Sequence, residues 1–189
     1  MIPMNILHIT TRNDFRKWLS ENHKKESECW LEAKRGKTPP ADALWYLDAV
    51  EEALCFGWID STVKNIDGVT LQRFSRRSRH SNWTELNKER CRRLESLGLM
   101  TDSGREVCPD FSAEFVVDSD IVAAFESNPA AMANFSTFHP LYRRVRIDTI
   151  QRNKANQEMF YSRLEKLIDA SERGEMFGEW NDNGRLLNY

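Results

Sequence analysis

The segment Glu51–Ser61, with the sequence EEALCFGWIDS, constrains the fold more than any other part of this chain. Its first half continues a helical apolar pattern up to Gly57, and glycine commonly ends a helix because it adopts left-handed backbone angles without strain. Trp58 and Ile59 then begin a run of strand-forming residues. We therefore predict a helix that stops near Phe56, followed by a strand that starts with a buried tryptophan and carries the carboxylate of Asp60.

Further helices and strands are predicted around this segment. Asp67-Gly68 separates two strand-like runs, which is a strong β-hairpin signal. Thr11 and Asp14 have a spacing close to that of a helix-capping box. The predicted strands are 5–9, 28–35, 58–66 and 69–74, and the predicted helices run from about 11 to 22, from 41 or 42 to 56, and from 83 to 97.

The remainder of the chain is mainly helical in pattern, after a weakly specified connector at 100–110. Helices are predicted near 120–126, 129–135, 141–152 and 157–171. The tail from Phe177 to Tyr189 is too apolar for a free end, so we expect it to pack on the fold. The sequence thus predicts an α+β fold, with a small, mainly antiparallel sheet packed by helices in residues 1–110 and a C-terminal helical region in residues 111–189.

Composition excludes several classes of protein. The chain has 189 residues, 40% of them hydrophobic, and a net charge of −2, so it is neither a polycation nor an acidic tail. It has no apolar run of membrane-spanning length and no secretory signal pattern at its start. We therefore expect a cytoplasmic protein without a membrane span.

The residue types used in metal and nucleophile chemistry are scattered along the chain. Cys29, Cys55, Cys91 and Cys108 form no C-x-x-C pair, and they are more typical of small core residues. The histidines lack metal-ligand spacing, and no nucleophile elbow or glycine-rich phosphate loop is present; they are His8, His23, His80 and His139. We accordingly assign no metal, no cofactor and no catalytic residue.

Three polar residues fall within apolar helical arcs. Asn87 and Arg90 lie in the arc of the helix predicted at 83–97, and Glu51 lies in the arc of the preceding helix. Because a buried arginine without a carboxylate is costly, we predict that Arg90 pairs with Glu51 or Asp60. Such a cluster is either a structural ion pair that fixes the helix on the sheet or the floor of a polar pocket, and the structural role is the commoner one.

Basic residues concentrate in the segment 73–93. It contains eight basic and two acidic residues, so its net charge is +6 and the rest of the chain carries −8. Basic side chains near aromatic ones are typical of phosphate or nucleic-acid sites, although a solvated loop and outer helix face would have the same composition. We predict a ligand-binding surface formed by Trp58, Arg73, Arg77, Trp83, Asn87 and Arg90.

Taken together, these motifs resemble the YdeI/OmpD-associated family of bacterial proteins. The resemblance rests on the segments 49–60, 81–87 and 118–135, with the shorter motifs at 15–19, 30–31, 73–75 and 98–100. It extends from about Asp14 to Ile168. Residues 74–78 lack the proline that the family usually has after its hairpin. The family is associated by name with an outer-membrane porin and with protection against bacteriocins and cationic peptides. The resemblance implies a soluble α+β protein and carries over no catalytic residues.

Three functional hypotheses follow. The favoured one is a non-enzymatic binding or stress-protection protein that holds an anionic small molecule or peptide group through Arg73, Arg77 and Arg90, or that binds a protein partner. The second is nucleic-acid binding through the segment 73–93. The third is an enzyme of unknown reaction that uses Glu51 or Asp60 as a base, which requires both carboxylates to be accessible in a pocket.

Overall fold

The computed structural model describes residues 5–78 and 81–189, which divide into two compact units. The first unit contains the chain up to Asn82, Arg90–Pro109 and Tyr189, and the second contains Trp83–Glu89 and Asp110–Asn188. Helix α3 (Glu85–Ser96) is therefore divided between them, with its first residues in the second unit. A boundary between separable domains at residue 110 stays a prediction.

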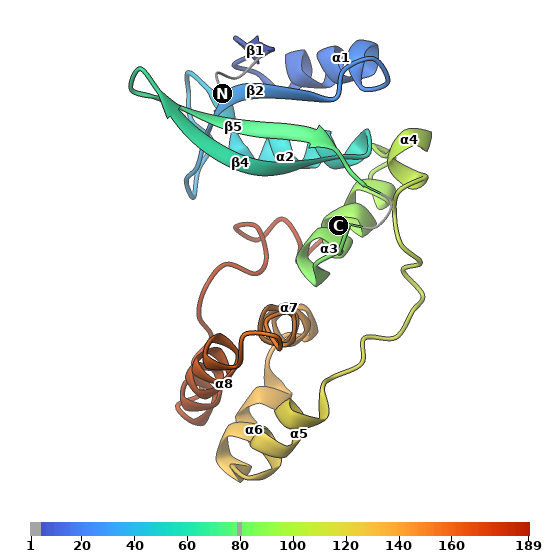
Figure 1. The fold of residues 1–189 in the computed structure, drawn as a ribbon. Helices are drawn as coiled ribbons and strands as arrows, with labels where there is room; N and C mark the ends of the chain where they lie inside the picture. The colour runs from blue at the N-terminus through green and yellow to red at the C-terminus, as the bar shows by residue number, and fades with distance from the viewer. Residues whose placement is uncertain (1–4, 79–80) are drawn as a thin grey trace. The chain divides into compact units, whose positions relative to one another are not determined.

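The first unit is built on a mixed sheet with the strand order β1-β2-β5-β4, in which β3 also pairs with β2 (Figure 1). The long strands pair antiparallel, whereas the two-residue strands β1 and β3 run parallel to β2. The strands are β1 (Ile6–Leu7), β2 (Glu28–Lys34), β3 (Leu44–Trp45), β4 (Trp58–Ile66) and β5 (Val69–Arg76). The predicted α+β class is confirmed, with a sheet followed by a helical C-terminal region.

Helices α1 (Arg12–Asn22) and α2 (Tyr46–Cys55) pack against each other, and α2 lies behind β4 and β5 in Figure 1. Phe15 of α1 contacts Phe74 of β5 at 5.4 Å between ring centroids. Trp58 is only 1% exposed, and its indole N–H donates to the carbonyl of His23 at 3.2 Å. The tryptophan that begins β4 is therefore a core residue, as predicted.

The two predicted glycine positions have the backbone angles that they require. Gly57 has φ +74°, and a Cβ there would lie 2.7 Å from the carbonyl oxygen of Ser103, so no other residue fits. At the hairpin, Asp67 and Gly68 have φ +50° and +84°, which matches the left-handed angles of a tight two-residue turn.

Three details of the sequence prediction are wrong. The second helix begins at Tyr46 and not near Ala41, because Leu44 and Trp45 pair with β2 as strand β3. The connector at 100–110 contains a short helix, α4 (Asp102–Arg105), which Thr101 caps by accepting from the Gly104 amide. The third helix, predicted to begin at residue 83, begins at Glu85.

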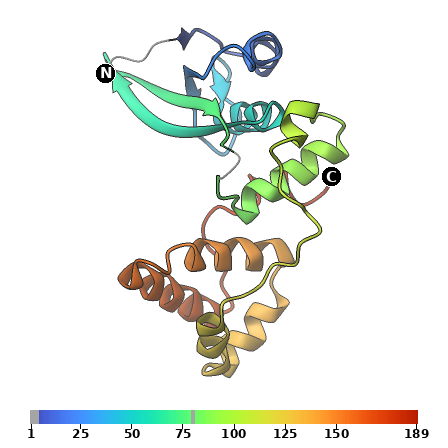
Figure 2. The ribbon, with the colours of Figure 1, turned by 45° about the vertical axis from the view of Figure 1, so that its right-hand side comes forward.

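The second unit contains α5 (Ser119–Glu126), α6 (Pro129–Thr137), α7 (Pro140–Gln151) and α8 (Gln157–Glu172), coloured yellow to red-brown in Figure 2. Each helix is preceded by an N-cap residue whose side chain accepts a hydrogen bond from a backbone N–H of the first turn. These N-cap residues are Asp118, Asn128, His139 and Asn156. Their apolar faces enclose a core that includes Ile121, Phe125, Tyr142, Phe160 and Leu167.

The tail after α8 packs on this helical core, as expected from its composition. Phe177 and Trp180 lie against the main cluster, and Leu186 is buried with Leu141 and Val145 of α7. Leu86, at the start of α3, packs against the same small cluster. No helix within residues 5–78 and 81–189 is long and apolar enough to cross a membrane.

Candidate functional site

The residues predicted to form one ligand-binding surface are divided between the two units. Trp83 and Asn87 belong to the second unit, and the other four belong to the first. Arg77 is 7% exposed and its guanidinium donates to the carbonyl of Asn82 at 2.8 Å, while Arg90 is 8% exposed. Arg73 lies on β5 and is held by an ion pair to Glu28 of β2. A common site formed by these six residues stays a prediction.

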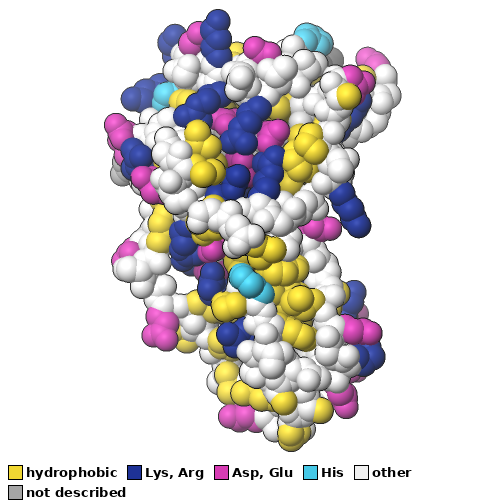
Figure 3. Space-filling view, turned by 180° about the vertical axis from the view of Figure 1, so that it is seen from behind, with side chains coloured by type: hydrophobic (Ala, Val, Ile, Leu, Met, Phe, Trp, Pro, Cys, Tyr) yellow, Lys and Arg dark blue, Asp and Glu magenta, His cyan; other side chains and the backbone are white. Residues whose placement is uncertain are grey.

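The carboxylates of Glu51 and Glu52 are buried and bonded. Glu51 accepts from Arg12 at 2.9 Å and from Arg93 at 2.6 Å, and Glu52 accepts from Arg12 at 2.6 Å and Arg16 at 2.7 Å. Figure 3 shows basic side chains gathered around acidic ones on the face seen from behind. Every carboxylate oxygen of the pair is an acceptor in an ion pair, and each glutamate is 1% exposed, which fits a structural cluster that joins α1, α2 and α3.

Asp60 has a different partner from those of Glu51 and Glu52. Its carboxylate accepts from the hydroxyl of Tyr46 at 2.6 Å and is half-buried. Burial and the neighbouring Asp60 raise the pKa of Tyr46 to about 12, so the phenol stays a hydrogen-bond donor at neutral pH. The buried Glu51 lacks the accessibility that the enzyme hypothesis requires, and the predicted pairing of Arg90 with Glu51 or Asp60 stays a prediction.

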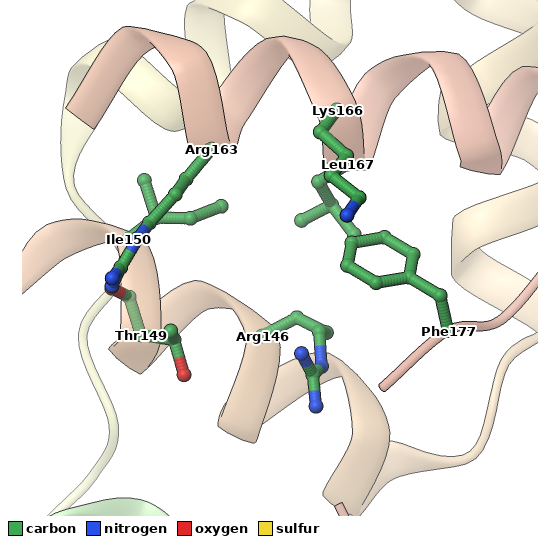
Figure 4. Close-up of a pocket in the computed structure, with 7 residues that line it drawn as sticks. All are labelled: Arg146, Thr149, Ile150, Arg163, Lys166, Leu167 and Phe177. Atoms are coloured by element: carbon green, nitrogen blue, oxygen red, sulfur yellow. The ribbon is translucent and has the colours of Figure 1, made fainter. Parts of the chain in front are cut away.

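A cavity of about 190 Å³ lies within the second unit, between α7, α8 and the tail (Figure 4). Arg146, Thr149 and Ile150 line it from α7, while Arg163, Lys166 and Leu167 line it from α8. Both triplets have the spacing i, i+3, i+4, which places three side chains on one helical face. Phe177 of the tail completes the wall, so a cationic rim surrounds an apolar surface of Ile150, Leu167 and Phe177.

The cations of this cavity contact rings and carbonyl groups instead of carboxylates. Arg146 lies 5.3 Å from the Phe177 ring centroid and donates to the carbonyl of Glu179, and the Lys166 ammonium lies 5.0 Å from the same ring. Arg163 donates to the carbonyl of Thr149 at 2.9 Å. Among the described residues, none of the three forms an ion pair.

The guanidinium of Arg146 is partly desolvated, and its neighbours do not fully compensate for the lost hydration. The Nε atom is buried and has no hydrogen-bond partner within the described ranges. Desolvation by burial lowers the pKa of Arg146, because a low-dielectric environment disfavours the charged form. An anion in the cavity would supply the missing negative charge beside the Arg146 guanidinium.

A second cavity, of about 360 Å³, adjoins the first and shares Arg146, Thr149 and Arg163 with it. Its other walls come from α7, the turn after it, the start of α3 and the tail. They are more polar than those of the first cavity and consist of Thr84, Leu86, Val145, Asp148, Arg152, Asn153 and Glu179. The two cavities together offer charged, apolar and hydrogen-bonding surfaces on either side of one pair of arginines.

Sequence reasoning did not single out Arg146 or Lys166. A signal for Arg146 was present, because it lies four residues after Tyr142 and four before Ile150, both of which are buried. Arg163 is likewise placed between Phe160 and Leu167 on α8. Arg90 was singled out because it is a cation within an apolar helical arc. The same criterion applies to Arg146 and Arg163.

Comparison with known proteins matches the N-terminal and the C-terminal parts of the chain to two different family models. Residues 7–107, more than half of the chain, match the model of a domain of unknown function (DUF8412), and the chain belongs to that family. Residues 114–174 match the OmdA model, described as bacteriocin-protection, YdeI or OmpD-associated, which confirms the resemblance at the level of this domain. The search of curated proteins and the search of solved structures each found no match.

The two matches assign the motifs of the resemblance to different families. The segments 49–60 and 81–87 fall within the DUF8412 match, whereas α5, α6, α7 and α8 fall within the OmdA match. Six of the seven residues that line the first cavity lie in the OmdA segment, and Phe177 follows it.

Proposed function

We propose that this member of the DUF8412 family is a binding protein whose OmdA-type helical unit holds the anionic group of a small ligand between Arg146, Arg163 and Lys166. One observation carries the proposal. Three cations converge on one cavity, and no carboxylate in the described part of the chain forms an ion pair with any of them. Charged side chains with a buried portion are normally paired, so this arrangement favours an external counter-ion.

The apolar wall narrows the ligand class. Ile150, Leu167 and Phe177 offer no hydrogen bond to a fully hydrated ion, whereas they favour an acid that carries a hydrocarbon or aromatic group. Lys166 is exposed and Arg163 is half-buried, so the cationic rim is accessible from solvent. An amphipathic carboxylate or phosphate of modest size therefore fits better than free phosphate.

The same observations weigh against the other functional hypotheses. The first-unit arginines that were expected to bind an anion include Arg73, which Glu28 already neutralises. Glu51 is enclosed by arginines and has no free oxygen for proton transfer. A nucleic acid would need a cationic surface much broader than this cavity.

Isothermal titration calorimetry of the full chain with benzoate tests the proposal. We expect saturable binding that weakens about tenfold, or about 1.4 kcal/mol, in Arg163→Gln and in Lys166→Gln, because each removes one charge from the cavity. Arg173→Gln is the matched control, since Arg173 also lies at the end of α8 but pairs with the exposed Glu175. The proposal fails if benzoate gives no saturable heat at millimolar concentration, or if the control weakens binding as much as the cavity variants do.

Protection against bacteriocins or cationic peptides is a separate part of the proposal and rests on the description of the OmdA model. The cationic cavity repels cationic groups, so we expect protection to depend on an anionic ligand and not on direct capture of a cationic peptide there. The test compares the survival of bacteriocin-treated bacteria that express the wild type, Lys166→Gln or Arg173→Gln. Equal survival of all three strains and of cells without the protein would refute it. The expected cytoplasmic location would be checked by cell fractionation.

A further inference from the structure

The second cavity offers hydrogen-bond acceptors beside the anion site. Asp148 is 8% exposed, and one of its oxygens accepts from the backbone amide of Glu85 at 3.1 Å. The other oxygen, Oδ1, has no hydrogen-bond partner within the described residues, and Asp148 lines the cavity. A ligand that enters here therefore meets an acceptor that needs a donor.

Asn153 presents a second acceptor at the same place. Its side-chain N–H group donates to the carbonyl of Thr149 at 2.8 Å, which fixes the amide orientation and leaves Oδ1 as the free end. Arg152, beside it, donates to the carbonyl of Trp83 at 3.3 Å and has further N–H groups for a ligand carbonyl. Acceptors and a donor together match the N–H and C=O of a peptide group.

The two cavities share part of their lining, so one ligand can occupy both. Arg146, Thr149 and Arg163 line both, so a carboxylate bound by the two arginines lies at the boundary between them. An apolar substituent would then extend toward Phe177 and Leu167, and an amide would extend toward Asp148 and Asn153. These three groups, all attached to a single carbon atom, describe an α-amino acid whose nitrogen is acylated.

We infer that the ligand of this site is an N-acylated α-amino acid with an apolar side chain, the chemistry found at the carboxyl terminus of a peptide. The inference rests on the proposed anion binding and adds the side chain and the amide to it. Capture of a terminal carboxylate beside a pocket for the last side chain is an established mode of peptide recognition. The acyl group supplies an amide N–H for the acceptors of Asp148 and Asn153, and its carbonyl is an acceptor for Arg152.

A set of matched probes separates these contributions by calorimetry on the full chain. N-acetyl-L-leucine carries all three groups, 4-methylpentanoate lacks the amide, and N-acetyl-L-leucinamide lacks the charge. We expect N-acetyl-L-leucine to bind at least tenfold more tightly than 4-methylpentanoate and the uncharged amide to show no saturable binding, because the arginines then have no counter-ion. Equal affinity of the two acids would overturn this inference and leave anion binding intact. Absence of binding by both acids, together with absence of benzoate binding, would overturn both proposals.

Two variants test the acceptors directly. In Asp148→Asn, the oxygen must stay on the Glu85 amide, so the side-chain NH₂ replaces the free acceptor and opposes a ligand N–H. In Asn153→Ala, the second acceptor is removed. We expect each variant to lose most of the advantage of N-acetyl-L-leucine over 4-methylpentanoate and to keep the affinity for 4-methylpentanoate within about twofold. An unchanged advantage in both variants would exclude the second cavity from binding.

The source of the ligand is distinguished by a longer probe. N-acetyl-Ala-Ala-Ala-Leu has the same terminal residue on a peptide chain. Affinity equal to or greater than that of N-acetyl-L-leucine assigns the site to peptide termini. Clearly weaker binding excludes a peptide terminus and assigns the site to free N-acyl amino acids.

Discussion

Half-buried arginines occur in both units of this protein, but their partners differ. In the first unit, Arg12 and Arg93 meet the buried carboxylates of Glu51 and Glu52. In the second unit, Arg146 meets a carbonyl group and aromatic rings. In the first unit, the arginine charges are neutralised by carboxylates and the ion pairs hold helices together. In the second unit, the charge of Arg146 has no carboxylate partner among the described residues.

Removing one partner from the glutamate cluster should lower the free energy of unfolding. Glu52→Gln leaves Arg16 without its carboxylate and Arg12 with only Glu51 and Asp48. Because both guanidinium groups are partly exposed, we expect a cost of about 1.5–3 kcal/mol. Asp42→Asn is the control, because Asp42 forms only an exposed 3.5 Å pair with Lys34, and such pairs contribute about 0–1 kcal/mol. Urea unfolding followed by circular dichroism measures both, and similar unfolding midpoints for the two variants would contradict a structural role for the cluster.

Cys108 should be the most reactive thiol at neutral pH. A hydrogen bond from Cys91 and the positive charge of Arg77 lower the pKa of Cys108, whereas burial raises the pKa of Cys55 to about 12. Because the thiolate is the nucleophile, iodoacetamide should label Cys108 first, with a rate that begins to rise at a lower pH than for an ordinary thiol. Mass spectrometry of partially labelled native protein checks the order, and earlier labelling of the fully buried Cys29 or Cys55 would contradict it.

Elements with a clear period were predictable from the sequence, and their partners were not. Helices α7 and α8 differ from the predicted ranges by one residue at their ends, because their apolar spacing is strong. Strand β3 and helix α4 were missed, since two and four residues are too short to show a period. The cavity was missed for another reason: it requires α7, α8 and Phe177 to come together, and packing partners are set by the tertiary fold.

Helix α4 provides a test at the scale of elements. A Cβ at Gly104 would lie 2.4 Å from the carbonyl oxygen of Cys55 at the end of α2, and backbone atoms cannot turn away. Gly104→Ala should therefore push α4 from α2 and cost about 1–3 kcal/mol. Gly36→Ala, where the nearest atom is 3.5 Å away, should change stability by less than about 0.5 kcal/mol. Thermal unfolding measures both, and equal melting temperatures would mean that α4 is not packed as the structure shows.

In the whole molecule, two family matches follow one another along the chain, whereas the two compact units interleave within α3. The residues Trp83–Glu89 belong to the helical second unit, and the residues Arg90–Pro109 that follow them belong to the first. Within that second unit, Leu86 packs against the cluster of Leu141, Val145 and Leu186, and Asp148 accepts from the Glu85 amide. A cut at residue 110, the boundary predicted from sequence, would separate the residues that make these contacts, and that boundary stays a prediction.

Fragments test this arrangement. A fragment of residues 82–189 keeps the contacts of Leu86 and Glu85 with α7, whereas 111–189 loses them. We expect the longer fragment to unfold cooperatively and at a higher temperature, because burial of Leu86 and the Glu85 amide bond adds to its core. Circular dichroism melts of the two fragments provide the comparison. A higher melting temperature for 111–189 would support a domain boundary at residue 110 instead.

Amide-resolved NMR shows whether the cationic cavity of the second unit binds an acid, and which residues the acid contacts. Titration of the ¹⁵N-labelled full chain with N-acetyl-L-leucine should give saturable shift changes centred on Arg146, Thr149, Arg163 and Phe177, and Lys166→Gln should require about tenfold more ligand for the same change. Shift changes centred elsewhere, or none at millimolar ligand, would show that the acid does not bind in this cavity.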